Sequence, residues 1–285
     1  MPRAVCYHQK GGGGMKGRRR ACLVLAMLAA GAAVWMGRAP RFAHARPGYP
    51  MVDLTGTVAR AEAGTPDYDL LFAQTGLGPS AVDALLEEGR GRELLDFQAR
   101  YFAPCHWQAV KGAAVVRLEV TEGGFEFVPL EKGDILLTPS SRCGGWRNGH
   151  AALVVDAEEG LVLEAYSLGC PSQLSSLSTW QDKAAVAVLR LKGVSAERRA
   201  AVADWAREHL LGLPYGLFSG LAWLGETSDP PATQCAHLVW CAYAAFGYDI
   251  DGGGGWPVTP RDISLSPLLE TVQVYGLPQG QRWPS

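Results

Sequence analysis

The 285-residue sequence predicts an α+β fold in which an antiparallel sheet packs on helices. Short segments rich in β-branched residues gather between residues 113 and 191, separated by glycine, aspartate, serine or proline. Helical patterns precede and follow that region, which is the order expected of an α+β domain. Nearly half of the residues, 48%, are hydrophobic, so burial can stabilise one large domain without a disulfide framework.

The N-terminal segment has the three parts of a secretory signal peptide. Arg18–Arg20 form a basic head, residues 21–36 form an apolar run, and Ala43-His44-Ala45 provides small residues for cleavage after position 45. The apolar run has 16 residues, whereas a bilayer span needs about 20. An uncleaved signal anchor is the alternative. Because residues 1–14 add nothing that a signal requires, Met15 is the expected start.

Removal of that segment changes the charge of the chain. Eight of the 26 Lys and Arg residues, and none of the 28 Asp and Glu residues, precede position 46. The mature chain would therefore hold 18 basic and 28 acidic residues, a formal charge of −10. Without a basic stripe that could contact phosphates, nucleic acid is an unexpected partner. We predict a secreted or cell-surface protein.

Residues 46–112 are expected to form a linker and a pair of helices. Scattered proline and glycine between 46 and 78 indicate a linker. Apolar residues spaced by three and four then predict helices over 79–89 and 92–102, split by a Gly-Arg-Gly break. We expect this helical extension to pack on the domain that follows.

Residues 113–285 are expected to form that domain, beginning with strands. Two of the strand segments, HAALVVD (150–156) and LVLEAY (161–166), flank a turn centred on residues 156–160 and predict an antiparallel hairpin. The remaining strand segments are AAVVRLEV (113–120), DILLT (134–138) and AVAVLRL (185–191).

Two helices are predicted after the strands. One spans 195–212, with Ser195 as its N-cap and Gly212 just past its C-terminal end. The other spans 234–246 and carries an apolar stripe that begins with Cys235.

Cys235 is the first candidate functional residue. A thiol attacks carbonyl groups as the thiolate, which a helix N-terminus or a neighbouring base stabilises. Cys235 lies in the first turn of its predicted helix, where free backbone N–H groups could also hold an oxyanion. The apolar stripe fits a buried structural cysteine equally well. Position alone leaves both interpretations open.

His150 and Glu164 favour the nucleophile. His150 begins the first strand of the predicted hairpin, directly after Gly149. With the turn at 156–160, His150 and Glu164 leave the same face of the hairpin, directly opposite or one diagonal step apart. A carboxylate at that distance can orient an imidazole and stabilise its charged form. The alternatives are a solvated loop histidine and a solvent-facing glutamate.

Several motifs in this order resemble the permuted branch of the papain-like cysteine amidases of the NlpC kind, the YiiX-like branch. The resemblance covers roughly residues 130–276 and implies a circularly permuted NlpC-type fold. It implies Cys235 as nucleophile, His150 as base, Glu164 as its orienting partner and Tyr215 as a wall of the site. The family usually has serine after the cysteine, whereas this chain has Ala236, which leaves the substrate specificity open. The motifs are GDILL (133–137), GHAALVV (149–155), LEAY (163–166), the Gly212–Tyr215 segment, QCAHLVWCAY (234–243) and VTPRDISLSP (258–267).

Other candidates are assigned lesser roles. No cysteine–histidine spacing typical of a zinc site occurs, so we expect neither a metal nor a cofactor. Cys143 and Cys170 flank the hairpin, and in an oxidising compartment they are expected to form a disulfide. Trp146 and Trp256, each close to glycines, are expected to line a substrate groove.

The predicted function is that of a secreted cysteine amidase or peptidase that forms a thiol acyl-enzyme. The resemblance suggests stem peptides of the bacterial cell wall as substrates. A thiol acyltransferase or lipid-ester hydrolase would use the same three residues, and a non-catalytic wall-binding module would keep only the fold. The oligomeric state stays open.

Overall fold

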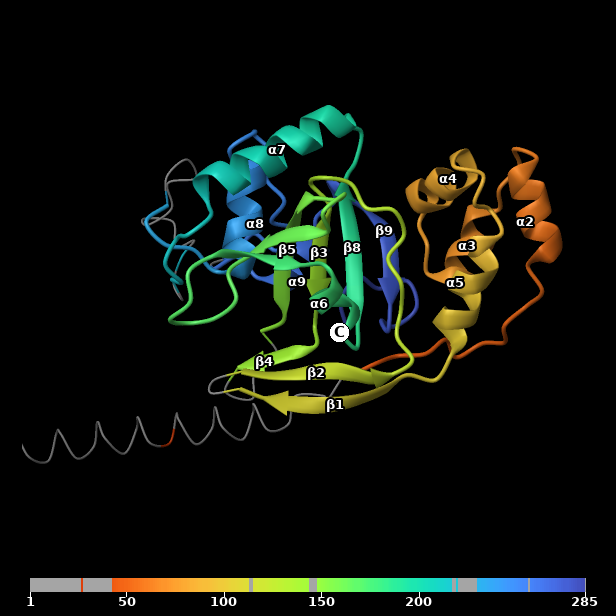
Figure 1. Cartoon of the computed structure of the whole chain (residues 1–285), viewed down its shortest axis with the longest axis horizontal. Coiled ribbons are helices and arrows are strands. Elements are labelled where there is room, and N and C mark those ends of the chain that lie inside the picture. The colour runs from red at the N-terminus through yellow and green to blue at the C-terminus, as the bar shows by residue number, and fades with distance from the viewer. Residues whose placement is uncertain are drawn as a thin grey trace, which may run out of the picture. The chain divides into compact units, whose positions relative to one another are not determined.

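The computed structural model describes residues 27, 43–112, 115–143, 148–216, 219, 230–255 and 257–284. The chain divides into two compact units, Met1–Arg41 and Phe42–Ser285, and every element named below belongs to the second. That unit is an α+β structure with antiparallel sheets packed on helices, as predicted (Figure 1). The signal segment, apart from Met27 and its last residues, lies outside the described residues. Within them, no helix has both the length and the apolar character required to cross a bilayer.

The central sheet has six strands in the order β7-β6-β5-β3-β8-β9, and all neighbouring strands are antiparallel. The predicted hairpin is confirmed, because β5 and β6 pair directly on both sides of the expected turn. The six strands are β3 (Ile135–Thr138), β5 (His150–Asp156), β6 (Leu161–Glu164), β7 (Gln173–Ser176), β8 (Val186–Leu191) and β9 (Leu269–Tyr275).

Helices cover both faces of this sheet, which explains why its strands are apolar without alternation. Odd-numbered residues of β5, such as Leu153, face α7 (Ala196–His209) and α8 (Cys235–Ala244). Even-numbered residues, such as Ala152 and Val154, belong to a second core with the N-terminal helices. The nucleophile candidate and the hairpin are thus held by one continuous core.

The N-terminal region departs from the prediction of a linker before residue 79. Two further helices, α2 (Thr55–Glu62) and α3 (Tyr68–Thr75), precede the two predicted ones, α4 (Pro79–Glu87) and α5 (Glu93–Phe102). Each added helix has only eight residues, too short for a clear apolar repeat. Burial of their apolar side chains against the sheet and the other helices stabilises them.

Four strands were not predicted. Two of them, β1 (His106–Lys111) and β4 (Ser141–Cys143), flank β2 (Val115–Glu122) in a separate three-stranded sheet. The side chains of β1 are mostly exposed, so the segment lacks the apolar signal of a core strand. The other two, β7 and β9, form the edges of the central sheet, where polar residues are interspersed with apolar ones.

Three helices of the C-terminal half, α7, α8 and α9 (Pro260–Ser264), begin at side-chain caps. The predicted N-cap Ser195 is confirmed, because its side chain accepts a hydrogen bond from the N–H of Arg198 at 3.3 Å. Gln234 caps α8 in the same way, and Thr259 begins the short helix α9 with a capping box. A single-turn helix, α6 (Ser178–Gln181), precedes β8.

A buried ion pair joins β8 to the start of β3. Arg190 donates to both carboxylate oxygens of Asp134 at 2.7 Å, and neither side chain is more than 7% exposed. The hydroxyl of Tyr243 on α8 donates to the carbonyl of Gly133, next to Asp134. Burial raises the pKa of Asp134 even though Arg190 opposes that shift. The pair therefore anchors the strands against which α8 is placed.

We expect Asp134→Asn to lower the free energy of unfolding by about 3 kcal/mol, because it removes the buried, two-point partner of the Arg190 guanidinium and leaves only the more exposed Glu131. Urea denaturation at neutral pH measures this change. Asp204→Asn is the matched control, because Asp204 pairs with Lys132 on the surface with 60% of its side chain exposed. Equal stability of the two variants would contradict an anchoring role for the buried pair.

The predicted Cys143–Cys170 disulfide is wrong for this structure. Cys170 is an exposed free thiol. A cysteine at each end of a hairpin does not by itself bring two sulfur atoms within bonding distance, because Cα atoms more than about 7 Å apart cannot be bridged.

Candidate functional site

His150 and Glu164 lie one diagonal step apart on the β5–β6 hairpin, as predicted. Leu153 pairs with Leu163 and Val154 with Val162, so the same ladder places Glu164 opposite Ala152, two residues from His150. The imidazole Nε2 is 2.7 Å from a carboxylate oxygen of Glu164. Both side chains are buried, with 7% and 4% exposure. A buried hydrogen bond of this kind fixes the orientation of the ring.

Cys235 is the first residue of α8, and its side chain lies close to His150. Its N-terminal neighbour Gln234 caps the helix: the side-chain oxygen accepts from the N–H of Ala236 at 2.9 Å and lies 3.4 Å from the thiol sulfur. The side-chain amide of Gln234 donates to the carbonyl of Val258 at 2.8 Å. Gln234 thereby holds the first turn of the helix in place.

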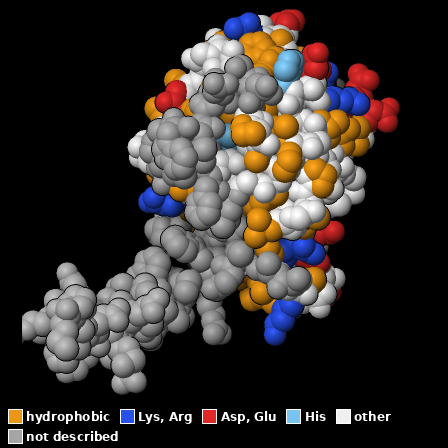
Figure 2. Space-filling model, turned by 90° about the vertical axis from the view of Figure 1, so that its left-hand side faces the viewer, with side chains coloured by type: hydrophobic (Ala, Val, Ile, Leu, Met, Phe, Trp, Pro, Cys, Tyr) orange, Lys and Arg blue, Asp and Glu red, His pale blue; other side chains and the backbone are white. Residues whose placement is uncertain are grey.

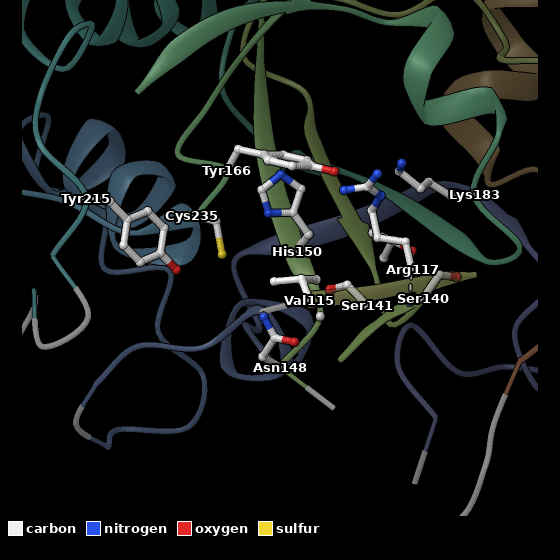
Figure 3. A pocket seen from close by; sticks show the side chains of 12 residues that line it. Val115, Arg117, Ser140, Ser141, Asn148, His150, Tyr166, Lys183, Tyr215 and Cys235 are labelled. Carbon is white, nitrogen blue, oxygen red and sulfur yellow. Dashed lines mark hydrogen bonds between the residues drawn. The ribbon is translucent and has the colours of Figure 1, made fainter. Parts of the chain in front are cut away.

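The side chains of Cys235 and His150 meet in a pocket between α8, the start of β5 and the three-stranded sheet (Figure 3). Cys235 lies on one side of the imidazole, and Nδ1, the ring nitrogen that does not contact Glu164, points toward its sulfur (Figure 3). Tyr215 lies beyond Cys235 on the same wall. The structure thus brings together Cys235, His150 and Glu164, and it places Tyr215 beside them.

Two aromatic rings flank the imidazole of His150. Trp180 is fully buried and stacks on it with ring centroids 5.5 Å apart and an interplanar angle of 18°. Tyr166 meets it edge-on at 5.5 Å. The face of an indole ring stabilises an adjacent cation. The packing therefore fixes the position of the ring and favours its protonated form.

The pKa of His150 is raised to about 9 by its neighbours. Burial alone would lower the pKa, but hydrogen bonds to Cys235 and Glu164 and the negative charges of both groups outweigh it. Burial acts to raise the pKa of Glu164, but the His150 hydrogen bond and charge, with help from Ser175, keep it below its usual value. At neutral pH the pair is therefore an imidazolium and a carboxylate.

Several pocket residues were not singled out from the sequence. Tyr166 lies within a quoted motif, LEAY, but its role against the imidazole depends on the fold. Lys183 and Arg117 come from segments far from any motif, so only the fold brings them to the site. Trp146 and Trp256, the predicted groove residues, lie outside the described residues.

A second cysteine–histidine pair lies deeper along α8. Cys241 and His237 are one turn apart, fully buried, with the sulfur 3.3 Å from Nε2. Burial raises the pKa of Cys241 to about 12 and lowers that of His237 to about 4. Both groups are therefore neutral at neutral pH.

Among the described residues, no group of three or more histidine, cysteine, aspartate or glutamate side chains is arranged to hold a metal ion. The pocket contains the thiol of Cys235 and the imidazole of His150, two groups that can take part in acyl transfer.

Comparison with known proteins gives limited similarity. No protein-family model matches the chain. It is 29% identical over 142 residues to the uncharacterized protein YycO of Bacillus subtilis (strain 168), covering 50% of this chain and 55% of that protein. The chain thus spans little more than half the length of this relative. The crystal structure of metalloprotein YiiX from Escherichia coli O157:H7 matches with a TM-score of 0.40 and 21% identity, over 55% of this chain and 99% of YiiX.

Proposed function

We propose that this protein is a cysteine hydrolase of the permuted papain-like kind, which cleaves an amide through a thiol acyl-enzyme. The observation that carries the proposal is that Cys235 and His150 line one pocket while Glu164 contacts the same imidazole at 2.7 Å. A nucleophile, a base and a group that orients the base are the parts that acyl transfer requires.

The reaction begins with the thiolate of Cys235 and the imidazolium of His150. The sulfur attacks the carbonyl carbon of the amide and forms a C–S bond, and the carbonyl oxygen takes the negative charge. Collapse of this intermediate breaks the C–N bond while His150 gives its proton to the leaving amine. His150 then removes a proton from water, the resulting hydroxide attacks the thioester, and the acid leaves as the thiolate is regenerated.

The N–H of Cys235 is the proposed donor to the oxyanion. The N–H of Ala236 is already bonded to the Gln234 side chain, and that of Leu238 to the Gln234 carbonyl. Within the described part of the chain, the N–H of Cys235 has no such acceptor. It lies at the positive end of α8, next to the attacking sulfur.

Stem peptides of the bacterial cell wall are the proposed substrates, on the basis of the sequence resemblance. Incubation of purified protein with peptidoglycan should release new amino groups without new reducing sugar ends, because an amide and not a glycosidic bond is broken. Release of reducing ends would contradict an amidase.

Acyl transfer or hydrolysis of lipid esters is the second candidate, and it would use the same thiol. Hydrophobic side chains spread over the middle of the face shown in Figure 2, with charged ones toward its ends. An acyl chain bound on this face would contact these side chains. Product analysis with peptide and lipid-ester substrates distinguishes the two candidates, and a wall-binding module would convert neither.

Export through the N-terminal signal is also part of the proposal. We expect cleavage between Ala45 and Arg46, so that N-terminal sequencing of the exported protein should begin at Arg46. Cleavage there would remove His44, whose Nδ1 is 2.7 Å from the carbonyl of Ala184, and Ala45, whose N–H donates to Gly276 at 2.9 Å. An exported chain that still contains residues 21–36 would identify the segment as an anchor.

A further inference from the structure

Two cations line the pocket and have no part in the proposed reaction. Arg117 from β2 and Lys183, just before β8, lie on the opposite side of His150 from Cys235 (Figure 3). Lys183 is only 8% exposed. A buried ammonium group costs free energy unless a partner compensates its charge. The placement of these two groups therefore requires an explanation.

Three carboxylates act on Lys183 through their charge, those of Glu119, Glu164 and Asp182, and the first two are already bonded to other cations. Glu119 is bonded to Arg117 at 2.9 Å, and Glu164 is bonded to His150 at 2.7 Å. Within the described part of the chain, the ammonium group of Lys183 forms no ion pair within 4 Å and donates no hydrogen bond, although the backbone N–H of Lys183 donates to the carbonyl of Trp180 at 3.1 Å. Burial lowers the pKa of Lys183, and the charge of Arg117 adds to that effect while Glu119 and Glu164 oppose it.

An unsatisfied hydroxyl lies in the same wall. The side-chain oxygen of Ser141 is buried without a hydrogen-bond partner, and the residue is 6% exposed. Its neighbours on this wall differ, because the hydroxyl of Thr138 donates to the carbonyl of Ala185 at 2.6 Å and that of Ser140 accepts from the N–H of Ala185 at 3.0 Å. A buried unsatisfied hydroxyl in a pocket wall is a ready donor for a ligand.

We propose that Lys183, Arg117 and Ser141 form a subsite for an anionic group of the substrate, a carboxylate or a phosphate. The inference rests on the proposed function, because it names the class of acyl substrate that Cys235 attacks. The anion supplies the counter-charge that Lys183 lacks and the acceptor that Ser141 lacks. The guanidinium of Arg117, held by Glu119 and lying over the Tyr166 ring, lines the same pocket and adds a second positive charge to the subsite.

Matched thiol reagents test the subsite. N-iodoacetylglycine and N-iodoacetylglycinamide share one reactive carbon and differ only in their carboxylate, and N-iodoacetyl-aminomethylphosphonate carries a phosphonate in its place. The second-order rate of Cys235 labelling is measured with each reagent at constant ionic strength, with mass mapping of every cysteine. We expect the carboxylate reagent to react about 10-fold faster than its amide in the wild-type protein.

Substitutions separate the effect of Lys183 on the ratio of the two labelling rates, carboxylate reagent over amide reagent, from the effect of the nearby imidazolium. Lys183→Met should bring the ratio of the two rates close to that of Cys170, the exposed thiol on the same chain. Lys132→Met, which removes a surface cation paired with Asp204, should leave the ratio at the wild-type value. Ser141→Ala changes one oxygen atom and should lower the ratio by about threefold. A wild-type ratio equal to that of Cys170, or one that Lys183→Met does not change, would overturn the subsite.

The two proposals fail in different ways. If no reagent labels Cys235 faster than Cys170, the nucleophile is wrong. The subsite is then decided by NMR titration with N-acetylglycine and N-acetylglycinamide, which need no thiol chemistry. Binding of the carboxylate alone, lost in Lys183→Met, supports the subsite, and equal binding of both compounds overturns it. A faster reaction of the phosphonate than of the carboxylate would identify a phosphate group in the substrate.

Discussion

Cys235→Ala should reduce amide hydrolysis by more than about 10⁵-fold, because no other group can form the acyl-enzyme. The variant should keep its fold, since alanine fits the first turn of α8 and the Gln234 cap does not depend on the sulfur for its hydrogen bond to Ala236. New amino groups released from peptidoglycan peptides measure the loss. Cys170→Ser, which changes an exposed thiol, is the matched control and should retain wild-type activity.

The same thiol should be alkylated at neutral pH faster than any other cysteine of the folded protein. The imidazolium of His150 and the N-terminus of α8 both stabilise its thiolate. His150→Ala should remove much of this reactivity, and the losses from His150→Ala and Cys235→Ala should not add, because the two residues act as one unit. Digestion of wall peptides by Cys235→Ala at the wild-type rate would end the nucleophile assignment.

Activity should fall as the pH rises through about 9, the pKa of His150. In the proposed reaction the imidazolium gives a proton to the leaving amine, and its population decreases when the pH exceeds that pKa. The pKa is raised above the ordinary value of 6.5, so the charged form persists over the whole neutral range. The pH profile of kcat/KM measures this alkaline limb, and NMR of the histidine ring gives the pKa directly.

Glu164→Gln should move the alkaline limb to lower pH. The amide oxygen can still accept the hydrogen bond from Nε2, but the charge that stabilises the imidazolium is lost. We expect about a 10-fold loss of activity at neutral pH, because a charge-assisted hydrogen bond is replaced by a neutral one. His150→Ala should lose about 10²–10⁴-fold. An alkaline limb that stays in place in Glu164→Gln would mean that the carboxylate does not set the pKa.

The spatial relation of His150 and Glu164 could be predicted from the sequence, because it depends on strand parity. Side chains two residues apart on a strand share a face, and the short turn between the strands limits their relative register. The position of Cys235 could also be predicted, since the apolar stripe that begins with this residue indicates where a helix starts. Each argument depends on residues within a single hairpin or a single helix, and such short-range patterns are preserved when the chain folds.

The two cations that line the pocket, Lys183 and Arg117, could not be predicted in this way. Lys183 is far from Arg117 in the sequence, and the two meet only because a separate sheet folds over the end of β5. The helices α2 and α3 were also missed, since each is stabilised by packing on distant residues rather than by its own repeat.

The bulge in β5 determines where the chain tolerates insertions and deletions. Val154 pairs with Val162, but Asp156 pairs with Leu161, so Val155 is an extra residue between the turn and the catalytic candidates. Residues added to the turn beyond this bulge would lengthen an exposed loop and leave His150 and Glu164 facing each other. Loss of a single residue on the other side, between His150 and the bulge, would turn the imidazole to the opposite face of the sheet. Homologous chains should therefore differ in length at the hairpin turn and keep a constant spacing along the strand before it.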